Sequence, residues 1–335
     1  MFEVPLLLVI IVLVALVFDF TNGAHDCANA IATVVSTKVM SPRAAVVMAA
    51  SLNLVGAFLG TKVATTLGSG IVNTEMVASC QPLVLAALLA AIAWNVITWY
   101  FGIPSSSSHA LIGGLMGAAM AYAGFETLNA SSIVHKILLP LVLSPLAGFS
   151  VGFLFMLIIG LLFARANRNR LTHAFTRLQI LSAAFMATSH GLNDAQKTMG
   201  VITLALFIFN QIDVITVPFW VKCVCAMSMA AGTALGGWKI VKTMGHKIFK
   251  LEPVHGFATE TSASLVITCA SLIGAPISTT HTITACIFGV GSTKRLSAVR
   301  WGIAGNLVVA WILTIPASAI LSALFFYLFE LVGVV

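Results

Sequence analysis

The sequence has 335 residues, a formal net charge of +7, 59% hydrophobic residues and only 8% charged residues. Soluble domains carry about 25% charged residues, so this composition excludes a soluble globular protein and indicates an integral membrane protein. The apolar runs are rich in Gly, Ala and Ser and do not alternate with polar residues, which favours an all-α polytopic protein over a β-barrel. At about 20 residues per span, the chain is long enough for about ten to twelve membrane segments.

The first apolar run predicts a helix from Val4 to Phe20. It lacks a basic flank and a small-residue cleavage site, so we expect a retained helix rather than a signal peptide. The stretch 19–30 that follows sets Asp26, other polar side chains and Gly23 in apolar sequence, which predicts a broken helix. The next apolar stretch predicts one long helix over residues 42–66.

A hydroxyl cluster ends the next predicted helix, which covers residues 76–101. Residues 102–109 read Gly-Ile-Pro-Ser-Ser-Ser-Ser-His. The apolar run at 110–117 is too short to cross a membrane, so we predict a re-entrant helical hairpin here. A helix over residues 137–163 closes this half of the chain.

The chain then repeats the same landmarks in the same order. Residues 274–281 read Gly-Ala-Pro-Ile-Ser-Thr-Thr-His and match 102–109 at an offset of 172, which predicts a second re-entrant hairpin. The polar stretch around Asp26 has a counterpart around Asp194, at an offset of 168. We therefore predict a duplication, with a first transmembrane repeat over 1–164, a basic cytoplasmic linker over 165–177 and a second repeat over 178–335.

The basic residues indicate how the repeats are oriented, because Lys and Arg mark cytoplasmic loops. Lys38 and Arg43 lie in a loop whose counterpart, 210–213, has no basic residue, whereas the loops at 242–250 and 294–300 are more basic than their first-half counterparts. This pattern predicts an inverted-topology repeat with the linker inside the cell and both termini on the outer side. It also explains the net positive charge, so no nucleic-acid partner is expected.

The hydroxyl clusters predict an anion site. A Ser/Thr cluster at the start of a half-helix offers hydroxyls and free backbone N–H groups at the positive end of the helix dipole. Two such ends that converge can enclose a tetrahedral oxyanion without Lys or Arg. The hydroxyls expected to bind it belong to Ser106, Ser107, Ser108, Ser278, Thr279 and Thr280.

Carboxylates near that site predict coupling to a cation. Asp26 and Asp194 would repel the anion unless a proton or a metal cation accompanies it, and an ionisable residue inside a membrane is a functional candidate. Asp together with nearby Asn can serve either a proton or a sodium ion.

Four motifs resemble the PiT family of inorganic phosphate transporters. They are Asn-Gly-Ala-His-Asp-Cys-Ala-Asn-Ala at 22–30, Ser-His-Gly-Leu-Asn-Asp-Ala-Gln-Lys at 189–197, and the two hydroxyl clusters at 105–109 and 276–281. The resemblance implies an inverted-repeat fold and secondary transport of phosphate, free or as a metal–phosphate complex, coupled to H+ or Na+. It further implies a homodimer in the cytoplasmic (inner) membrane of a bacterium.

Within that family the chain resembles the bacterial low-affinity, proton-linked branch. Asn53 stands where many sodium-coupled members carry a Glu, whereas Glu260 matches an acid of the sodium-coupled members, so Na+ stays open as the alternative. We expect Asn29 and Asn193 to join the phosphate ligands. The expected coupling set comprises Asp26, Asp194, Asn22, Asn53 and Glu260, supported by His109, His281, His25 and Lys197. No cofactor and no structural metal are expected.

The hydroxyl clusters also allow three other interpretations. Ser and Thr in membrane helices often bond only to preceding carbonyls or to neighbouring helices. An intramembrane hydrolase could use a Ser–His pair, but Ser107 and His109 are two residues apart and a second cluster has no role at a single catalytic centre. A passive anion channel would leave Asp26 and Asp194 without a role.

Overall fold

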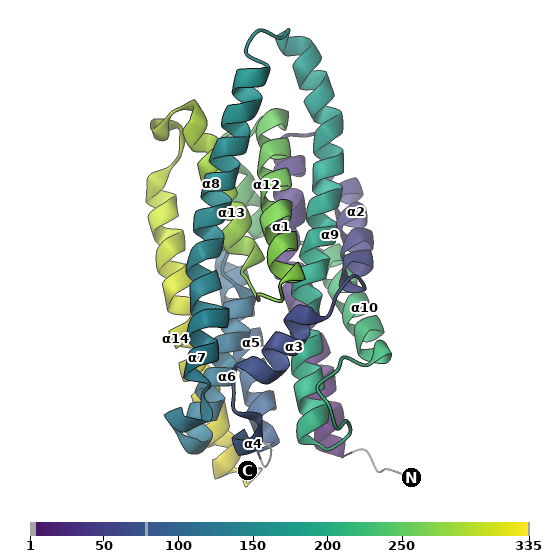
Figure 1. Ribbon diagram of the computed structural model, residues 1–335, viewed down its shortest axis with the longest axis vertical. Helices are drawn as coiled ribbons and strands as arrows, with labels where there is room; N and C mark the ends of the chain where they lie inside the picture. The colour runs from purple at the N-terminus through teal and green to yellow at the C-terminus, as the bar shows by residue number, and fades with distance from the viewer. Residues whose placement is uncertain (1–4, 78–79, 334–335) are drawn as a thin grey trace.

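The structure is a computed structural model that describes residues 5–77 and 80–333. Within these ranges the chain is almost entirely helical (Figure 1). The helices of the first half are α1 (Leu6–Ser36), α2 (Pro42–Ala57), α3 (Lys62–Gly70), α4 (Thr74–Val77), α5 (Pro82–Phe101), α6 (Ser107–Ala123), η1 (Phe125–Thr127), α7 (Ala130–Ser132), the π-helix η2 (Ile133–Leu138) and α8 (Leu139–Leu162). Those of the second half are α9 (Arg168–Ile208), α10 (Phe219–Leu235), α11 (Trp238–Lys242), the π-helix η3 (Thr243–Lys247), α12 (Pro253–Leu272), α13 (Thr279–Lys294), η4 (Leu296–Ala298) and α14 (Trp301–Leu331).

The first helix does not end at Phe20, so that prediction and the expected break at Gly23 were wrong. α1 continues through the polar stretch to Ser36, and Val4, where the helix was expected to begin, lies outside the described residues. The polar side chains at 19, 22, 26, 29 and 33 follow one face of α1 at helical spacing and are all buried. Other parts of the protein pack against this face, so the helix needs no break to accommodate its polar side chains.

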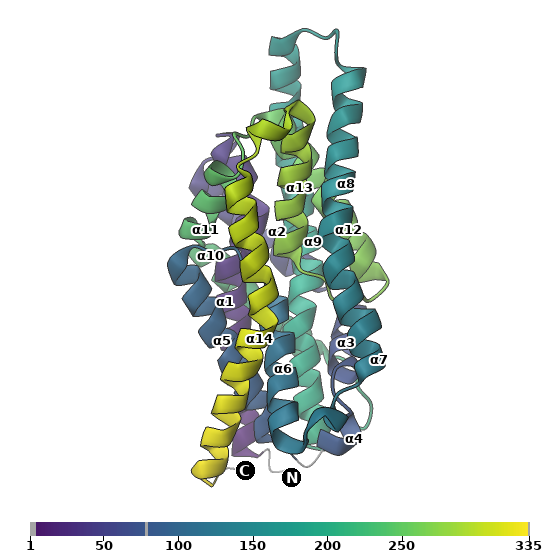
Figure 2. The ribbon, with the colours of Figure 1, turned by 90° about the vertical axis from the view of Figure 1, so that its left-hand side faces the viewer.

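The predicted helix over 42–66 was also wrong, because it is two helices. α2 ends at Ala57 and α3 begins at Lys62, with an angle of 71° between them. α10 and the α11–η3 segment repeat this bend at 60°. Each bend brings a lysine to the hairpin of the other half, since Lys62 donates to the carbonyl of Leu272 and Lys239 donates to that of Tyr100. Figure 2 shows α3 and α11 on opposite sides of the molecule.

Two helical hairpins meet in the interior. α5 and α6 enter from the end of the molecule that holds both termini, and α12 and α13 enter from the opposite end (Figures 1 and 2). Gly102 and Gly274, with φ of 66° and 79°, end the first arm of each hairpin in the left-handed region that favours glycine. Pro104 and Pro276 follow and keep the turn extended until the second arm begins.

The two halves pack into one another. α1 packs on α10 while α9 packs on α2, and α6 packs on α14 while α13 packs on α8. At the first two contacts the backbones come so close that a Cβ on Gly23 would overlap the carbonyl of Met229, and one on Gly191 would overlap the carbonyl of Asn53. Each of these contacts between a helix of the first half and one of the second half therefore has a counterpart in which the two halves exchange roles.

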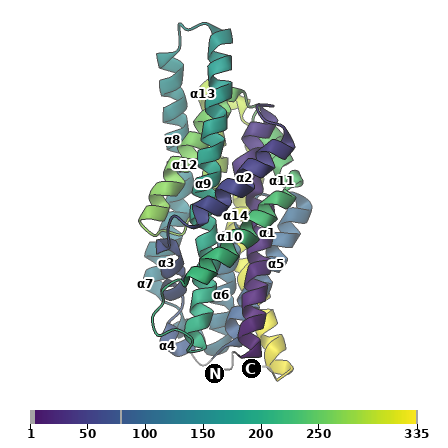
Figure 3. The same ribbon diagram turned by 90° about the vertical axis from the view of Figure 1, so that its right-hand side faces the viewer.

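Corresponding helices of the halves run in opposite directions. In Figure 3 α1 rises from the end that holds the termini, whereas α9 descends toward it, and the connections that follow α1, α8 and α13 all lie at the other end. These connections contain or adjoin the basic residues at 38, 43, 165–177 and 294–300. These basic residues thus gather at the end opposite the termini.

The outer surface is apolar enough for a lipid environment. Within the described residues four helices are long and apolar enough to cross a membrane, or up to six if each bent pair is one span. The surface of α8 and α14 exposes a run of large aliphatic side chains, among them Leu146, Leu157, Leu161, Ile312, Ile320 and Leu324. Exposed apolar faces of this extent are those of a membrane protein.

Candidate functional site

The second arms of both hairpins start with a capped, hydroxyl-rich turn. Ser106 accepts a hydrogen bond from the backbone N–H of His109, and Ser278 accepts one from that of His281, each at 3.2 Å. These N-caps hold the first turns of α6 and α13 in place. The neighbouring hydroxyls at 107, 108, 279 and 280 are buried and point to residues outside their own hairpin arms.

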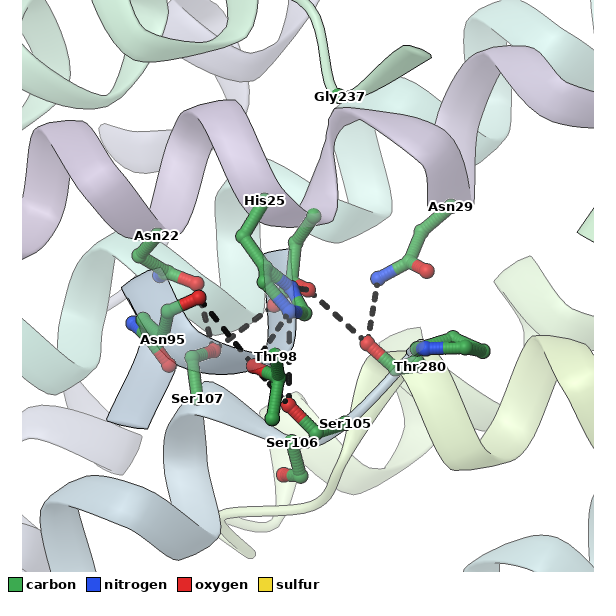
Figure 4. Close-up of polar contacts among 12 residues, drawn as sticks. Asn22, His25, Asn29, Asn95, Thr98, Ser105, Ser106, Ser107, Gly237 and Thr280 are labelled. Carbon is green, nitrogen blue, oxygen red and sulfur yellow. Dashed lines mark hydrogen bonds and ion pairs between the residues drawn. The ribbon is translucent and has the colours of Figure 1, made fainter. Parts of the chain in front are cut away.

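Asp26 lies where both hairpins meet α1. Ser107 donates to its Oδ2 at 2.8 Å from the first hairpin, and Thr280 donates to its Oδ1 at 3.1 Å from the second. The ring Nδ1 of His25 lies 2.7 Å from Oδ1. Figure 4 shows His25 on α1 above Ser107 and Thr280, which belong to two different hairpins.

Asp194 takes the equivalent place on α9. Thr279 donates to its Oδ2 at 2.9 Å, as Ser107 does to Asp26. Lys197, one turn further along α9, forms an ion pair with Oδ1, and the ring Nε2 of His190 lies 2.9 Å from Oδ2. Both carboxylates are therefore held by hydroxyls from the hairpin starts.

Two further contacts cross between the halves. Asn29 on α1 donates from Nδ2 to Thr280 at 3.0 Å and lies 3.3 Å from Thr279. Lys197 on α9 donates to Ser108. Four of the hydroxyls predicted to bind phosphate, at 107, 108, 279 and 280, thus form one buried cluster with Asn29, Lys197 and the two Asp. Ser106 and Ser278 instead cap their own helices.

The other Asn residues of the predicted site take different positions. Asn22 Oδ1 accepts a hydrogen bond from Ser107 at 2.6 Å, and Asn193 donates to Ser271 at 2.8 Å. Each of these two residues keeps one buried amide atom without a partner among the described residues, as does Asn29. Buried amide atoms of this kind can meet an additional ligand.

Asn53 does not reach the carboxylates itself. Its Oδ1 lies 3.1 Å from Nδ1 of His190, and its Nδ2 donates to Thr233 at 2.9 Å. Because His190 in turn adjoins Asp194, Asn53 acts on the site by orienting that ring. The sequence reasoning missed His190, although its place four residues before Asp194 on a helix was a usable signal.

His25 is likewise backed by residues that the sequence reasoning missed. Its Nε2 lies 3.2 Å from Thr98 and 3.4 Å from Ser105, and Ser105 donates to Thr98 at 2.8 Å (Figure 4). Only the fold brings Thr98, at the end of α5, beside α1. This hydroxyl pair fixes the ring of His25 against Asp26.

Glu260 lies apart from the two Asp. It is fully buried and accepts hydrogen bonds from Thr33 and Ser182, with Gln179 Nε2 at 3.4 Å. Thr33 belongs to the polar face of α1 that also carries Asp26. The structure therefore brings Glu260 to a separate polar cluster on the same helix face.

His109 and His281 contact each other rather than the carboxylates. Their rings are 4.6 Å apart, and the ring of His281 stacks on Trp311 at 4.1 Å. Trp311 donates to the carbonyl of Pro104 at 3.2 Å. These aromatic contacts join the two hairpins directly behind their hydroxyl turns.

The centre of the site combines acceptors and donors in a small volume. Ligand atoms of Asp26, His190 and Asp194 lie within 4.8 Å of one another, and all three side chains are buried. Hydroxyl donors and two helix N-termini face the same place, so an oxyanion and a cation could both be held there.

Comparisons with known proteins find related phosphate transporters. The family model described as the phosphate transporter family matches residues 22–322. A protein of Rhizobium meliloti (strain 1021) is 50% identical, and one of Bacillus subtilis (strain 168) is 46% identical, each over 98% of both chains. Both are named "Probable low-affinity inorganic phosphate transporter". A solved structure, "The sodium-dependent phosphate transporter", matches 98% of this chain and 100% of its own with a TM-score of 0.88 at 25% identity.

The fold and the buried central site define a helical membrane transporter. The matched family and relatives are transporters rather than enzymes, which leaves the Ser–His hydrolase without support. The chain belongs to the phosphate transporter family.

Proposed function

We propose that this protein is a symporter that imports inorganic phosphate together with protons. The observation that carries the proposal is the contact of Asp26 with hydroxyls from both hairpins, at 2.8 Å from Ser107 and 3.1 Å from Thr280. One set of groups thereby serves both the anion and the cation. The proposed phosphate ligands are Ser106, Ser107, Ser108, Ser278, Thr279, Thr280, Asn29 and Asn193.

Shared hydroxyls supply a physical reason for coupling. A hydroxyl has one proton to donate, so Ser107 or Thr280 cannot donate fully to Asp26 and to a phosphate oxygen at the same time. When phosphate accepts these hydrogen bonds, the carboxylate loses its donors and faces a second anion in a low-dielectric interior. A proton or cation at Asp26 replaces the lost hydrogen bonds and neutralises the charge that repels phosphate. Phosphate and the cation therefore each favour binding of the other.

The coupling ion is the proton in this proposal, with sodium as the alternative. Asn53 places an amide at a position where an acid would add a cation ligand, and its partner is His190 rather than a carboxylate. A sodium-dependent structural neighbour supports sodium instead, and so does the presence of Glu260. The proposed coupling residues are Asp26, Asp194, Asn22, Asn53 and Glu260.

The substrate could also be a neutral metal–phosphate complex, which one specific observation favours. Asp26, His190 and Asp194 offer ligand atoms within 4.8 Å of one another, beside the hydroxyls proposed for phosphate. In this alternative the metal ion is transported together with phosphate and replaces some of the protons. Uptake of radioactive Mn²⁺ that depends on phosphate distinguishes it from transport of free phosphate.

We further propose an inverted-topology repeat in the inner membrane, over residues 1–164 and 178–335, with both termini outside. The opposite directions of α1 and α9, the exchanged packing partners and the basic residues at one end support this proposal. Ten to twelve membrane segments and a homodimer complete the proposal.

The experiment compares accumulation with exchange in proteoliposomes. Asp26→Asn should abolish accumulation of phosphate driven by an imposed ion gradient but keep part of the exchange of internal for external phosphate, because exchange does not require return of an empty carrier. Asp194→Asn should also lose driven accumulation. Driven accumulation by both variants at the wild-type level would contradict coupling through these carboxylates.

A further inference from the structure

The two halves place different residues at one equivalent position of the site. Asp26 and Asp194 are 168 positions apart, and the same offset relates Asn29 to Lys197. Asn29 donates to Thr280 at 3.0 Å, and Lys197 donates to Ser108. Ser108 and Thr280 are themselves equivalent, at an offset of 172. Matching residues thus make matching contacts, but only one of the two donors is charged.

The ammonium of Lys197 is paired with neighbouring side chains. Its side chain is 1% exposed, and it forms an ion pair with Asp194, which is 0% exposed. A lone ammonium or carboxylate buried this deeply is strongly destabilised, so each group compensates for the burial of the other. Two other titratable groups lie close to Asp194: the ring of His190 at 2.9 Å, and Asp26, whose ligand atom lies within 4.8 Å.

Asp26 has no such partner. Within the described part of the chain no Lys or Arg forms an ion pair with it, and its contacts are His25, Ser107 and Thr280. Of the two carboxylates, only Asp194 therefore has an ammonium partner among the described residues, and Asp26 has none.

We propose that Lys197 is a fixed counter-cation: its ammonium occupies, beside Asp194, the place that an exchangeable cation takes beside Asp26. The transporter then couples phosphate to a cation at Asp26 and to none at Asp194. The inference rests on the proposed symport and makes its two carboxylates unequal, since Asp194 serves through its ion pair and Asp26 through the ion it exchanges. Asn29, the uncharged counterpart of Lys197, leaves the place beside Asp26 open for the exchangeable cation.

Replacing the lysine tests this assignment. Lys197→Asn makes the two halves alike and leaves Asp194 bare, so a second exchangeable cation should enter with each phosphate. The number of cations per phosphate is measured in proteoliposomes as the phosphate gradient that just balances an imposed cation gradient. With a tenfold cation gradient, one additional cation raises the balancing phosphate gradient by about tenfold.

Matched variants separate this effect from general damage. Lys242→Asn removes the same charge from an exposed position on α11 and should keep the wild-type ratio. The double variant Asp194→Asn with Lys197→Asn removes the whole ion pair and leaves the net charge of the site unchanged, so any coupled transport that it retains should keep the wild-type ratio. Lys197→Met, which keeps most of the length of the side chain and removes its charge, replaces Lys197→Asn if that variant does not fold.

The outcomes distinguish the inference from the proposed function. A ratio for Lys197→Asn equal to that of the wild type, or a changed ratio for the double variant, overturns the role of Lys197 and leaves symport intact. If no phosphate gradient balances an imposed cation gradient in the wild type, the symport proposal itself is wrong.

Discussion

Removing the hydroxyls of Thr279 and Thr280 tests the anion site directly. Thr→Val keeps the size of the side chain and deletes its only donor. Thr279 donates to Asp194 at 2.9 Å and Thr280 donates to Asp26 at 3.1 Å, and both hydroxyls are buried. These are the groups proposed to turn toward phosphate during transport.

The expected magnitude follows from hydrogen bonds to charged groups. One such bond contributes about 1.5–3 kcal/mol, so each Val should weaken phosphate binding about tenfold or more. The double variant should lose less than the product of the single effects, because Asn29 contacts both hydroxyls and the two sites are coupled.

Radiolabelled phosphate uptake into proteoliposomes, measured over a range of phosphate concentrations, reports the change as a raised KM. Thr282→Val is the matched control, because Thr282 lies on the same helix, is equally buried and bonds only to the carbonyl of Ser278 at 2.8 Å. It should change KM by less than about twofold, which corresponds to about 0.4 kcal/mol. Normal uptake by the double variant Thr279→Val with Thr280→Val would mean that these hydroxyls serve helix packing alone.

Three further predictions concern packing, coupling and topology. Gly191→Ala should lower the free energy of unfolding of the purified protein by about 1–3 kcal/mol, because its Cβ would overlap a carbonyl of α2. Gly160→Ala is the control and should be neutral or stabilising by up to about 1 kcal/mol, because it has open space around it. Equal melting temperatures of the two variants would refute the close approach at Gly191. Glu260→Gln should reduce gradient-driven accumulation and retain phosphate exchange, and a variant that accumulates phosphate normally would remove Glu260 from coupling. In sealed cells, a membrane-impermeant thiol reagent should label Val214→Cys and not Arg168→Cys in a background without the native cysteines, and the reverse pattern would invert the proposed orientation.

Much of the site could be predicted because its chemistry is unusual for apolar sequence. Asp26, Asp194 and the two hydroxyl clusters are recognisable by type and by repetition, and the structure brings them together. The hairpin turns were also predictable, since Gly-x-Pro ends a helix in any setting.

Other parts depend on tertiary contacts that no local pattern encodes. The continuity of α1 through Gly23 was not predictable, because it depends on α10 lying against the backbone at that glycine. His190 and Thr98 join the site only through the packing of α9 and α5 around α1. The ion pair of Lys197 with Asp194 could be expected from their spacing of three residues on a helix, but its contact with Ser108 could not.

The central claim is that one buried site couples phosphate to a cation. Its most direct test is radiolabelled phosphate uptake into proteoliposomes under separately imposed pH and sodium gradients. The structure and the family lead us to expect accumulation above equilibrium when only the outside is acidic, and none without a gradient. Accumulation that requires sodium would replace the proton and keep the coupling site, whereas phosphate that only equilibrates under both gradients would contradict symport through Asp26 and Asp194.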